Sequence, residues 1–212
     1  MPLLRTPRPW LRRPQAGSAG ESSAPVPAGQ VATSLVGEST RLRPLRSSEI
    51  PILLSWMRDP QVGYYLGRLP FPIPWDVEAR WLEESLADPR VQLFAIETRE
   101  GRLIGNIGLH HLDPAAAQGE LSIVIGEVDH WDRGYGSDAI RSLLRYAFES
   151  LNLERVHLRV YEFNQRAVRC YEKCGFQREG TTRAALYRDG RFYDEVSMAI
   201  QKRQFLAQEQ SG

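Results

Sequence analysis

The stretch Trp131-Asp132-Arg133-Gly134-Tyr135-Gly136-Ser137 separates an apolar, strand-like segment from the strongest helical pattern of the chain. Two glycines separated by one residue let the backbone turn tightly and come close to a ligand. A helix that follows such a turn begins with N–H groups that lack partners, and these groups, together with the helix dipole, favour a bound anion. The stretch therefore predicts a binding loop for an anion such as pyrophosphate at the start of a helix.

The segments around this loop predict an α+β domain. Apolar residues recur at i, i+3, i+4 and i+7 from Ile140 onward, which predicts a helix over residues 136–151. Alternating patterns and turn residues predict strands elsewhere, and the three before the loop are close enough in sequence to form an antiparallel meander. The predicted strands are 40–46, 91–98, 102–111, 119–126, 155–161, 176–187 and 192–200; the other predicted helices are 47–58, 75–87 and 164–175; residues 60–74 are predicted to be a loop.

Bulk composition excludes several classes of protein. The chain has 212 residues, a formal net charge of +1 and no cluster of Lys and Arg, so it lacks the signature of a nucleic-acid-binding domain. No apolar run reaches the length of a membrane span. Two cysteines, Cys170 and Cys174, do not make a disulfide framework and are typical of a reducing compartment, so we expect a cytoplasmic protein.

The N-terminal segment differs in composition from the rest of the chain. Residues 1–38 contain six prolines and four arginines with scattered apolar residues, so we expect a disordered tail rather than a folded segment. An organelle transit peptide is the alternative, because the segment is rich in Arg and poor in acidic residues. The predicted organisation is thus a tail over 1–38, one domain over 39–205 and a flexible C-terminus over 206–212.

The glycine loop alone fits two kinds of cofactor site. Gly134, Gly136 and Ala139 also satisfy the G-x-G-x-x-(G/A) fingerprint of a dinucleotide-binding fold. That interpretation is disfavoured, since seven residues separate Gly126 from the first glycine of the motif and the preceding strands form a meander. A purely structural turn is a further alternative, because glycine is common in turns for conformational reasons alone.

Three motifs together resemble the GNAT superfamily of acyl-CoA N-acyltransferases over residues 40–203. The loop is similar to that family's (Q/R)-x-x-G-x-(G/A) motif, although Trp131 stands at the Gln or Arg position. Asn164-Gln165-Arg166-Ala167 and then Tyr171-Glu172-Lys173-Cys174-Gly175-Phe176 resemble its second signature. Gly190-Arg191-Phe192-Tyr193-Asp194 resembles an element of the branch that acetylates ribosomal-protein N-termini, in which Trp at the position of Trp131 is common.

The resemblance implies a mixed, mostly antiparallel sheet of about seven strands flanked by helices, with a splay between the fourth and fifth strands. It implies acetyl-CoA as co-substrate, bound in the splay, and direct transfer of the acetyl group to an amine. The residues expected to bind the cofactor are Val124, Ile125, Trp131, Arg133, Gly134, Tyr135, Gly136, Ser137, Asn164 and Tyr171.

Direct transfer needs a neutral amine, a donor for the developing oxyanion and a proton for the leaving thiolate. Glu120 and Ser122 share one face of their strand, so Glu120 is a candidate base, unless it is merely an exposed strand residue. An N–H group near Val124 is the candidate oxyanion donor. Tyr171 stands at the family's position for the general acid, although its helix spacing also fits core packing. Asn164 fits a contact with the pantetheine arm and equally a helix N-cap.

The acceptor amine is not identified by these motifs. Tyr64, Tyr65, Glu120 and Ser122 are the predicted acceptor-binding residues, and the acceptor is either a protein N-terminus or a small amine such as a polyamine or aminoglycoside. No metal is expected, since His110 and His111 alternate across their strand and the cysteines lack further ligands. The sequence leaves open a homodimer formed through an edge strand or a helix, and a non-catalytic acyl-CoA-binding or partner-binding module on the same fold.

Overall fold

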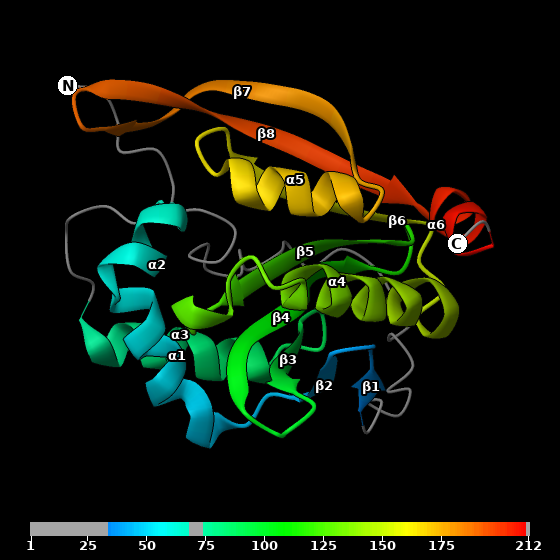
Figure 1. Ribbon diagram of the computed structural model, residues 1–212, viewed down its shortest axis with the longest axis horizontal. Coiled ribbons are helices and arrows are strands. Elements are labelled where there is room, and N and C mark those ends of the chain that lie inside the picture. Colours follow the sequence, from blue (N-terminus) through cyan, green and yellow to red (C-terminus); the bar gives the residue numbers. More distant parts are fainter. Residues whose placement is uncertain (1–33, 68–73, 211–212) are drawn as a thin grey trace.

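The computed structural model describes residues 34–67 and 74–210, which form one sheet of eight strands in the order β1-β2-β3-β4-β5-β6-β8-β7 (Figure 1). All neighbouring strands are antiparallel except β5 and β6, which are parallel and are joined by a crossover that contains helix α4. The strands are β1 (Leu35–Val36), β2 (Thr40–Pro44), β3 (Gln92–Thr98), β4 (Leu103–Asp113), β5 (Gln118–Ile125), β6 (Arg155–Tyr161), β7 (Gln177–Arg188) and β8 (Arg191–Gln201).

The sheet opens between its parallel strands. Strands β5 and β6 pair only over residues 118–120 and 155–157, and the last partners are Glu120 and His157. Beyond this point residues 121–125 of β5 keep their pairing with β4, and residues 158–161 of β6 keep theirs with β8. The predicted splay between the fourth and fifth expected strands is therefore confirmed, and the short β1 makes the eighth strand.

Helices cover both faces of the sheet. They are α1 (Ile50–Arg58), α2 (Pro60–Tyr65), α3 (Trp75–Ala87), α4 (Tyr135–Arg145), α5 (Gln165–Lys173) and α6 (Lys202–Glu209), with 3-10 turns at Ser47–Glu49 and Val128–His130. Alternation along β3 separates the two layers: Phe94 and Ile96 belong to the core under α4, whereas Leu93 and Ala95 pack with α1 and α3. Helix α5 lies between β5 and the β7–β8 hairpin (Figure 1).

The predicted helix over 136–151 changes its hydrogen-bond pattern near its end. Helix α4 ends at Arg145, and Tyr146–Ser150 continue as a π-helical turn, after which the N–H of Leu151 bonds the carbonyl of Tyr146. The apolar stripe is buried as predicted, since Ile140 and Phe148 are both 0% exposed.

Helix α2 corrects the prediction of a loop over 60–74. The Asp59-Pro60 pair, which lies between the helix predicted over 47–58 and the predicted loop, begins a new helix. The Asp59 carboxylate accepts hydrogen bonds from the N–H groups of Gln61 and Val62, and Pro60 occupies the first turn. Residues 68–73 of the predicted loop lie outside the described residues.

Both ends of the domain extend further than the sequence predicts. Leu35 and Val36, assigned to the tail, form β1 and pair with Leu42 and Arg41 of β2. The C-terminal residues 206–209, predicted to be flexible, belong to α6, whose Phe205 is 2% exposed in the main core. Residues 1–33 of the predicted tail and the last two residues, 211–212, lie outside the described part.

Candidate active site

Two adjoining cavities occupy the opening between β5 and β6. The larger has a volume of about 340 Å³ and lies against the glycine loop, while the smaller, of about 150 Å³, lies toward α1 and α3. Six residues line both cavities, so these residues mark the junction: Tyr65, Leu66, Ile123, Val124, Asn164 and Tyr171. A molecule bound in one cavity can therefore reach a molecule bound in the other.

The predicted glycine loop forms one wall of the larger cavity. Gly134 is the N-cap of α4 and has φ of +84°, a conformation that favours glycine, and no side chain caps the helix. Gly134, Tyr135, Gly136 and Ser137 line the cavity, so the first turn of α4 presents its N–H groups there. Arg133, predicted with them, is exposed and does not line the cavity.

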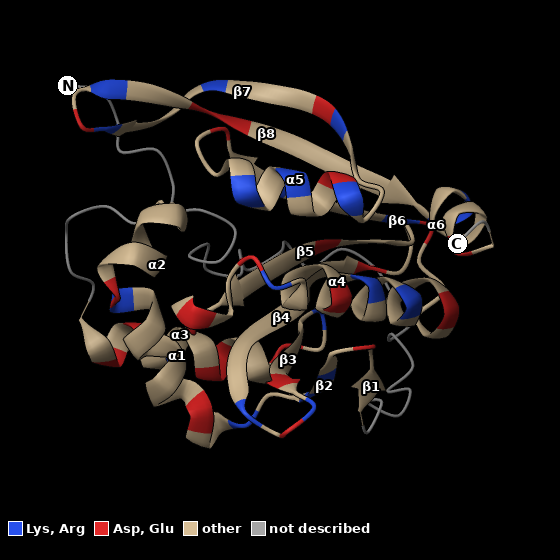
Figure 2. Cartoon of the chain, viewed as in Figure 1, with Lys and Arg blue, Asp and Glu red and all other residues tan. Residues whose placement is uncertain are grey.

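Cations from α5 form the opposite wall. Arg166, Arg169 and Lys173 line the larger cavity, where Asp132 is the single acidic residue among the described lining residues. Figure 2 shows several Lys and Arg positions along α5. This excess of positive charge beside a helix N-terminus fits a polyphosphate group. The sequence pattern of this helix did not single out the three cations, because which of its side chains line the cavity depends on how α5 packs against the sheet.

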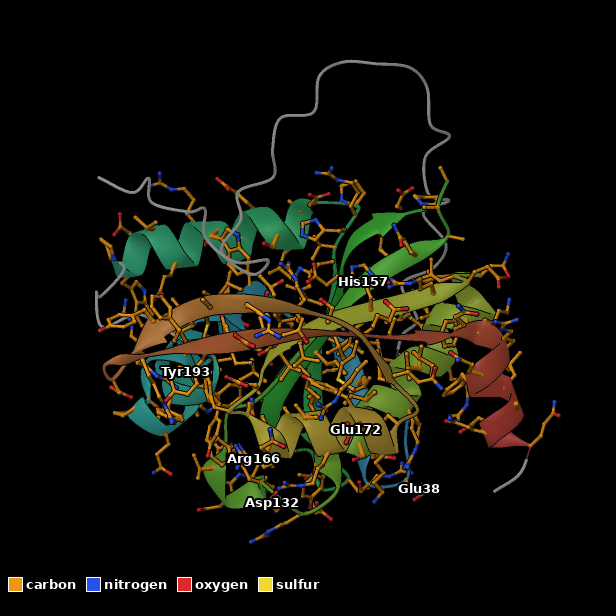
Figure 3. All side chains as sticks on the ribbon, turned by 90° about the horizontal axis from the view of Figure 1, so that it is seen from above. Glu38, Asp132, His157, Arg166, Glu172 and Tyr193 are labelled. Carbon is orange, nitrogen blue, oxygen red and sulfur yellow. The ribbon has the colours of Figure 1, made fainter. Side chains whose placement is uncertain are left out.

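Arg166 and Trp131 hold the mouth of the cavity together. The Arg166 guanidinium lies 3.6 Å from the ring centroid of Trp131 and 4.6 Å from that of Tyr65, and it is 3.8 Å from the Asp132 carboxylate. Figure 3 shows Arg166 and Asp132 side by side at the end of α5. Trp131 thus acts on the loop through its side chain, which explains how an aromatic residue can stand at the family's Gln or Arg position.

The N–H group of Ile125 points into the opening. A Cβ placed on Gly105 of β4 would lie 2.2 Å from the Val124 carbonyl oxygen, so that carbonyl is directed at β4. In a planar trans peptide the C=O and N–H point in opposite directions, so the Ile125 N–H is directed away from β4. The Ile125 carbonyl, which also faces away from β4, accepts a hydrogen bond of 2.8 Å from the Trp131 indole. Of the predicted pair, Ile125 therefore offers a free donor, whereas Val124 directs its carbonyl elsewhere.

Tyr171 and Asn164 stand at the junction of the cavities. Tyr171 is 8% exposed, and burial raises the pKa of its phenol above the ordinary value, with the neighbouring Cys170 and Cys174 adding to the rise. The phenol therefore keeps its proton at neutral pH, as a general acid must. The Asn164 side chain caps α5 by accepting a hydrogen bond from the Ala167 N–H, and it also lines both cavities.

Glu120 and Ser122 line the smaller cavity, as predicted. Glu120 is 6% exposed, and its Oε1 accepts hydrogen bonds of 3.1 and 3.0 Å from Nε and Nη2 of Arg159. Its Oε2 lies 3.7 Å from Nε2 of His111. The Ser122 hydroxyl lies 2.8 Å from Nε2 of His110. Glu120 is thus a buried carboxylate in an ion pair, and the alternative of an exposed strand residue is wrong.

Both histidines lie close to Glu120, which the expected alternation of the strand did not predict. His110 is opposite Glu120 in the sheet, and His111 has φ of +50° at an irregularity of β4, so its side chain leaves the regular alternation. Burial lowers the pKa of His110 to about 4, so this imidazole is neutral near pH 7. Among residues 34–67 and 74–210, no group of three or more His, Cys, Asp or Glu could hold a metal ion.

Tyr64, predicted to bind the acceptor, does not line either cavity. Its ring packs against Phe163, and the Arg188 guanidinium lies 3.8 Å from its centroid, so it joins α2 to the β7–β8 hairpin. Tyr65, the next residue along α2, lines both cavities. A helix places successive residues about 100° apart, so α2 directs only one of the two tyrosines inward.

Comparison with known proteins agrees with this geometry. Residues 40–177 match the family model of the acetyltransferase (GNAT) domain. The uncharacterized N-acetyltransferase p20 of Bacillus licheniformis is 28% identical over 177 residues, which are 81% of this chain and 97% of that protein. The spermidine N(1)-acetyltransferase of Vibrio cholerae is 31% identical over 123 residues, or 58% of this chain and 70% of that protein.

Solved structures show the same fold. The crystal structure of the Vibrio cholerae spermidine N-acetyltransferase in complex with CoA and spermine has a TM-score of 0.72 and 26% identity, covering 79% of this chain and 98% of that one. In the part of this chain that the structure describes, no helix is long and apolar enough to cross a membrane. The chain belongs to the GNAT acetyltransferase family, and it is an acetyl-CoA-dependent N-acetyltransferase.

Proposed function

We propose that acetyl-CoA binds in the larger cavity and that a primary amine enters through the smaller one, so that transfer takes place at their junction. The observation that carries this proposal is the shared wall of Asn164, Tyr171 and Val124 between the two cavities. Acetyl-CoA supplies the acetyl group as an activated thioester. Everything else required for transfer is a matter of binding, orientation and proton movement by residues of this chain.

The larger cavity suits the anionic part of the cofactor. The N–H groups at the start of α4, over residues 134–137, would bind the pyrophosphate, and the cations of α5 would bind further phosphate oxygens. The free Ile125 N–H would bind a carbonyl of the pantetheine arm or of the acetyl group, and the Asn164 amide would contact the same arm. These roles fit an unpaired donor and an uncapped helix that already line the cavity.

Proton transfers are assigned to two side chains. As the amine nitrogen bonds the acetyl carbon and the carbon–sulfur bond breaks, Tyr171 donates its proton to the departing CoA thiolate. The ammonium of the incoming acceptor first gives up one proton, directly or through water, to Oε2 of Glu120, the carboxylate oxygen that Arg159 does not contact. After the carbon–nitrogen bond has formed, the nitrogen gives up a second proton, which restores the Tyr171 phenol directly or through water. Ser122, held by His110, orients the acceptor.

The acceptor is a primary amine, either a small molecule or a protein N-terminus. The hypothesis of a small amine is supported by relatives named for spermidine, one of which was crystallised with CoA and spermine. The hypothesis of a protein N-terminus is supported by residues 190–194, which resemble an element of the GNAT branch that acetylates ribosomal-protein N-termini.

Replacement of the Tyr171 hydroxyl tests the assignment at the junction. Tyr171→Phe keeps the ring packing, so we expect kcat for acetyl transfer to fall by about 10²-fold or more, the contribution of a positioned general acid. The affinity for CoA, measured by calorimetry, should change by less than about threefold because the ring still fills its site. Release of CoA thiol with a panel of amines gives kcat.

Tyr187→Phe is the matched control, since Tyr187 is 58% exposed on the hairpin and lines neither cavity. An unchanged kcat in Tyr171→Phe would contradict the role of Tyr171. Binding of CoA without turnover of any primary amine would contradict the proposed reaction as a whole.

A further inference from the structure

The polar end of the smaller cavity contains a three-membered charge cluster drawn from three strands. Arg159 of β6 donates to Glu120 of β5 at 3.0 and 3.1 Å, and its Nη1 lies 3.9 Å from the carboxylate of Glu195 on β8. All three residues line the cavity. The guanidinium thus lies between the two carboxylates that an acceptor ammonium would meet.

The charge of this cluster limits how much positive charge an acceptor can carry. Two carboxylates and one guanidinium leave one net negative charge among the charged residues that the structure describes in the cavity lining. His110 is neutral near pH 7, because burial lowers its pKa to about 4. One ammonium can therefore be matched, whereas each further ammonium of a polycation would be desolvated without a partner, which is costly.

The opposite end of the cavity is apolar. It is lined by Leu53 of α1, Trp81 and Leu82 of α3, and Leu93 of β3. These side chains belong to, or pack against, the cluster of buried apolar residues that α1, α3 and β3 share. The cavity volume is about 150 Å³. An apolar cavity of about that size holds a benzene-sized group. The wall therefore suits a compact hydrocarbon group joined to the amine and offers little to the spaced ammonium groups of a polyamine.

We propose that the acceptor of this enzyme is a singly charged primary amine bearing a compact apolar group, with the amine at Glu120 and the apolar group against Trp81 and Leu82. Arg159 is the specificity-determining residue, since it neutralises one of the two carboxylates. This inference rests on the function proposed above. Two sources share the chemistry: a free hydrophobic amine, and a peptide whose first residue is apolar.

Comparison of kcat/KM for different acceptor amines tests the inference directly. We expect kcat/KM for leucinamide to exceed that for glycinamide by about tenfold or more, from burial of the side chain. We expect leucinamide to exceed spermidine and spermine by about tenfold or more, because each extra ammonium lacks a carboxylate. A tripeptide that begins with Leu, compared with leucinamide, distinguishes a peptide N-terminus from a free amine.

Removal of the guanidinium should shift this preference. Arg159→Met leaves two carboxylates in the cavity, so the ratio of kcat/KM for spermidine to that for leucinamide should rise by about tenfold. Glu195→Gln should move the same ratio in the opposite direction and provides a second measurement if Arg159→Met fails to fold. Arg155→Met is the matched control, since Arg155 lies on the same strand with similar exposure but pairs with Glu179 outside both cavities.

Each outcome bears on one proposal. Preference of the wild type for spermidine or spermine, or an unchanged ratio in both cavity variants, would overturn the inference and leave the proposed reaction intact. Acetylation only of other primary amines would likewise overturn the inference, whereas binding of CoA without acetylation of any amine in a wide panel would instead overturn the proposed reaction.

Discussion

Tyr171 and Cys170 are neighbours on α5, and their environments shift their pKa values in opposite directions. Burial raises the pKa of the Tyr171 phenol. The Cys170 thiol, which lines the larger cavity, has its pKa lowered to about 7 by hydrogen bonds from the Cys174 thiol and the Ser137 hydroxyl, which lies 3.3 Å away. Cys174 is 2% exposed and its thiol lies 3.6 Å from the Ser137 carbonyl. The two cysteines, one helix turn apart, thus differ in the direction of their pKa shifts and in position, since Cys170 lines the larger cavity and Cys174 is buried.

Cys170 should therefore report occupancy of the larger cavity. At pH 7.5 the thiolate form of Cys170 is the nucleophile, so iodoacetamide should modify Cys170 and leave Cys174 unmodified. Saturating CoA should slow the modification by about tenfold or more, because the bound ligand covers the thiol. Mass spectrometry of timed samples measures the rate at each cysteine.

Cys170→Ser and Cys174→Ser distinguish the two sites. Modification of Cys170 at the same rate with and without CoA would show that the cofactor does not cover the wall formed by α5.

Helix α4 is tied to the first hairpin of the sheet by one carboxylate. Asp138, in the first turn of α4, accepts hydrogen bonds from the backbone N–H groups of Glu38, Ser39 and Thr40. It also accepts from the hydroxyl groups of Ser39 and Thr40, the latter at 2.6 Å. The glycine loop immediately precedes this helix, so the same contacts fix the position of the predicted anion site relative to the sheet.

Loss of this carboxylate should destabilise the domain. Asp138→Ala leaves several donors without a partner, and we expect the free energy of unfolding to fall by about 2 kcal/mol. Urea unfolding followed by circular dichroism measures the change. Asp76→Ala is the matched control, since Asp76 is an exposed acidic residue in the first turn of α3, where the helix dipole acts in the same way. Equal losses in the two variants would show that Asp138 acts only through the dipole.

The molecule as a whole consists of two half-sheets that meet at one short parallel pairing. Strands β1–β5 carry the glycine loop and Glu120, whereas β6–β8 carry Arg159 and Glu195, and α5 lies along the opening (Figure 1). Glu120 and His157 form the last pair before the strands diverge. Both cavities exist because the sheet stays continuous at one end and opens at the other.

The buried His110, which lies opposite Glu120 in the sheet, should make the free energy of unfolding depend on pH. Burial lowers the pKa of His110 from the ordinary value of 6.5 to about 4. The negative charge of Glu120 opposes part of this shift. Between these values the unfolded chain binds more protons than the folded one, so the stability present above pH 6.5 is lost as the pH falls toward 4. From pH 7 to pH 5 we expect a loss of about 2 kcal/mol from His110.

Urea unfolding at the two pH values measures this loss. His157, whose pKa burial also lowers, adds to the loss in the same direction. His110→Asn should remove most of the dependence, whereas His111→Asn, at a side chain that is 53% exposed, should leave it. A pH dependence that is the same in wild type and His110→Asn would contradict the burial of a neutral imidazole.

Elements with strong local patterns were predicted from the sequence with their correct type. Strand β6 has the predicted bounds, α5 begins after Asn164, and the glycine loop precedes α4 as expected. Strand alternation also led to the Glu120 position, and the family resemblance led to the Tyr171 position; both residues line the smaller cavity. Helix α2 was missed because Asp59-Pro60 is equally typical of a helix end and a helix start, and only the bonds to Gln61 and Val62 distinguish them.

The sequence by itself determined most of the elements, the glycine loop at the start of a helix and the family, because each of these was recognised from short runs of neighbouring residues. Tertiary structure alone decided that Arg159 lies between Glu120 and Glu195, that His110 holds Ser122, and that Tyr65 rather than Tyr64 faces the cavities. Those facts depend on the register of strands far apart in the chain and on the rotation of packed helices. No local pattern encodes either one, since each is set by the packing of the whole core.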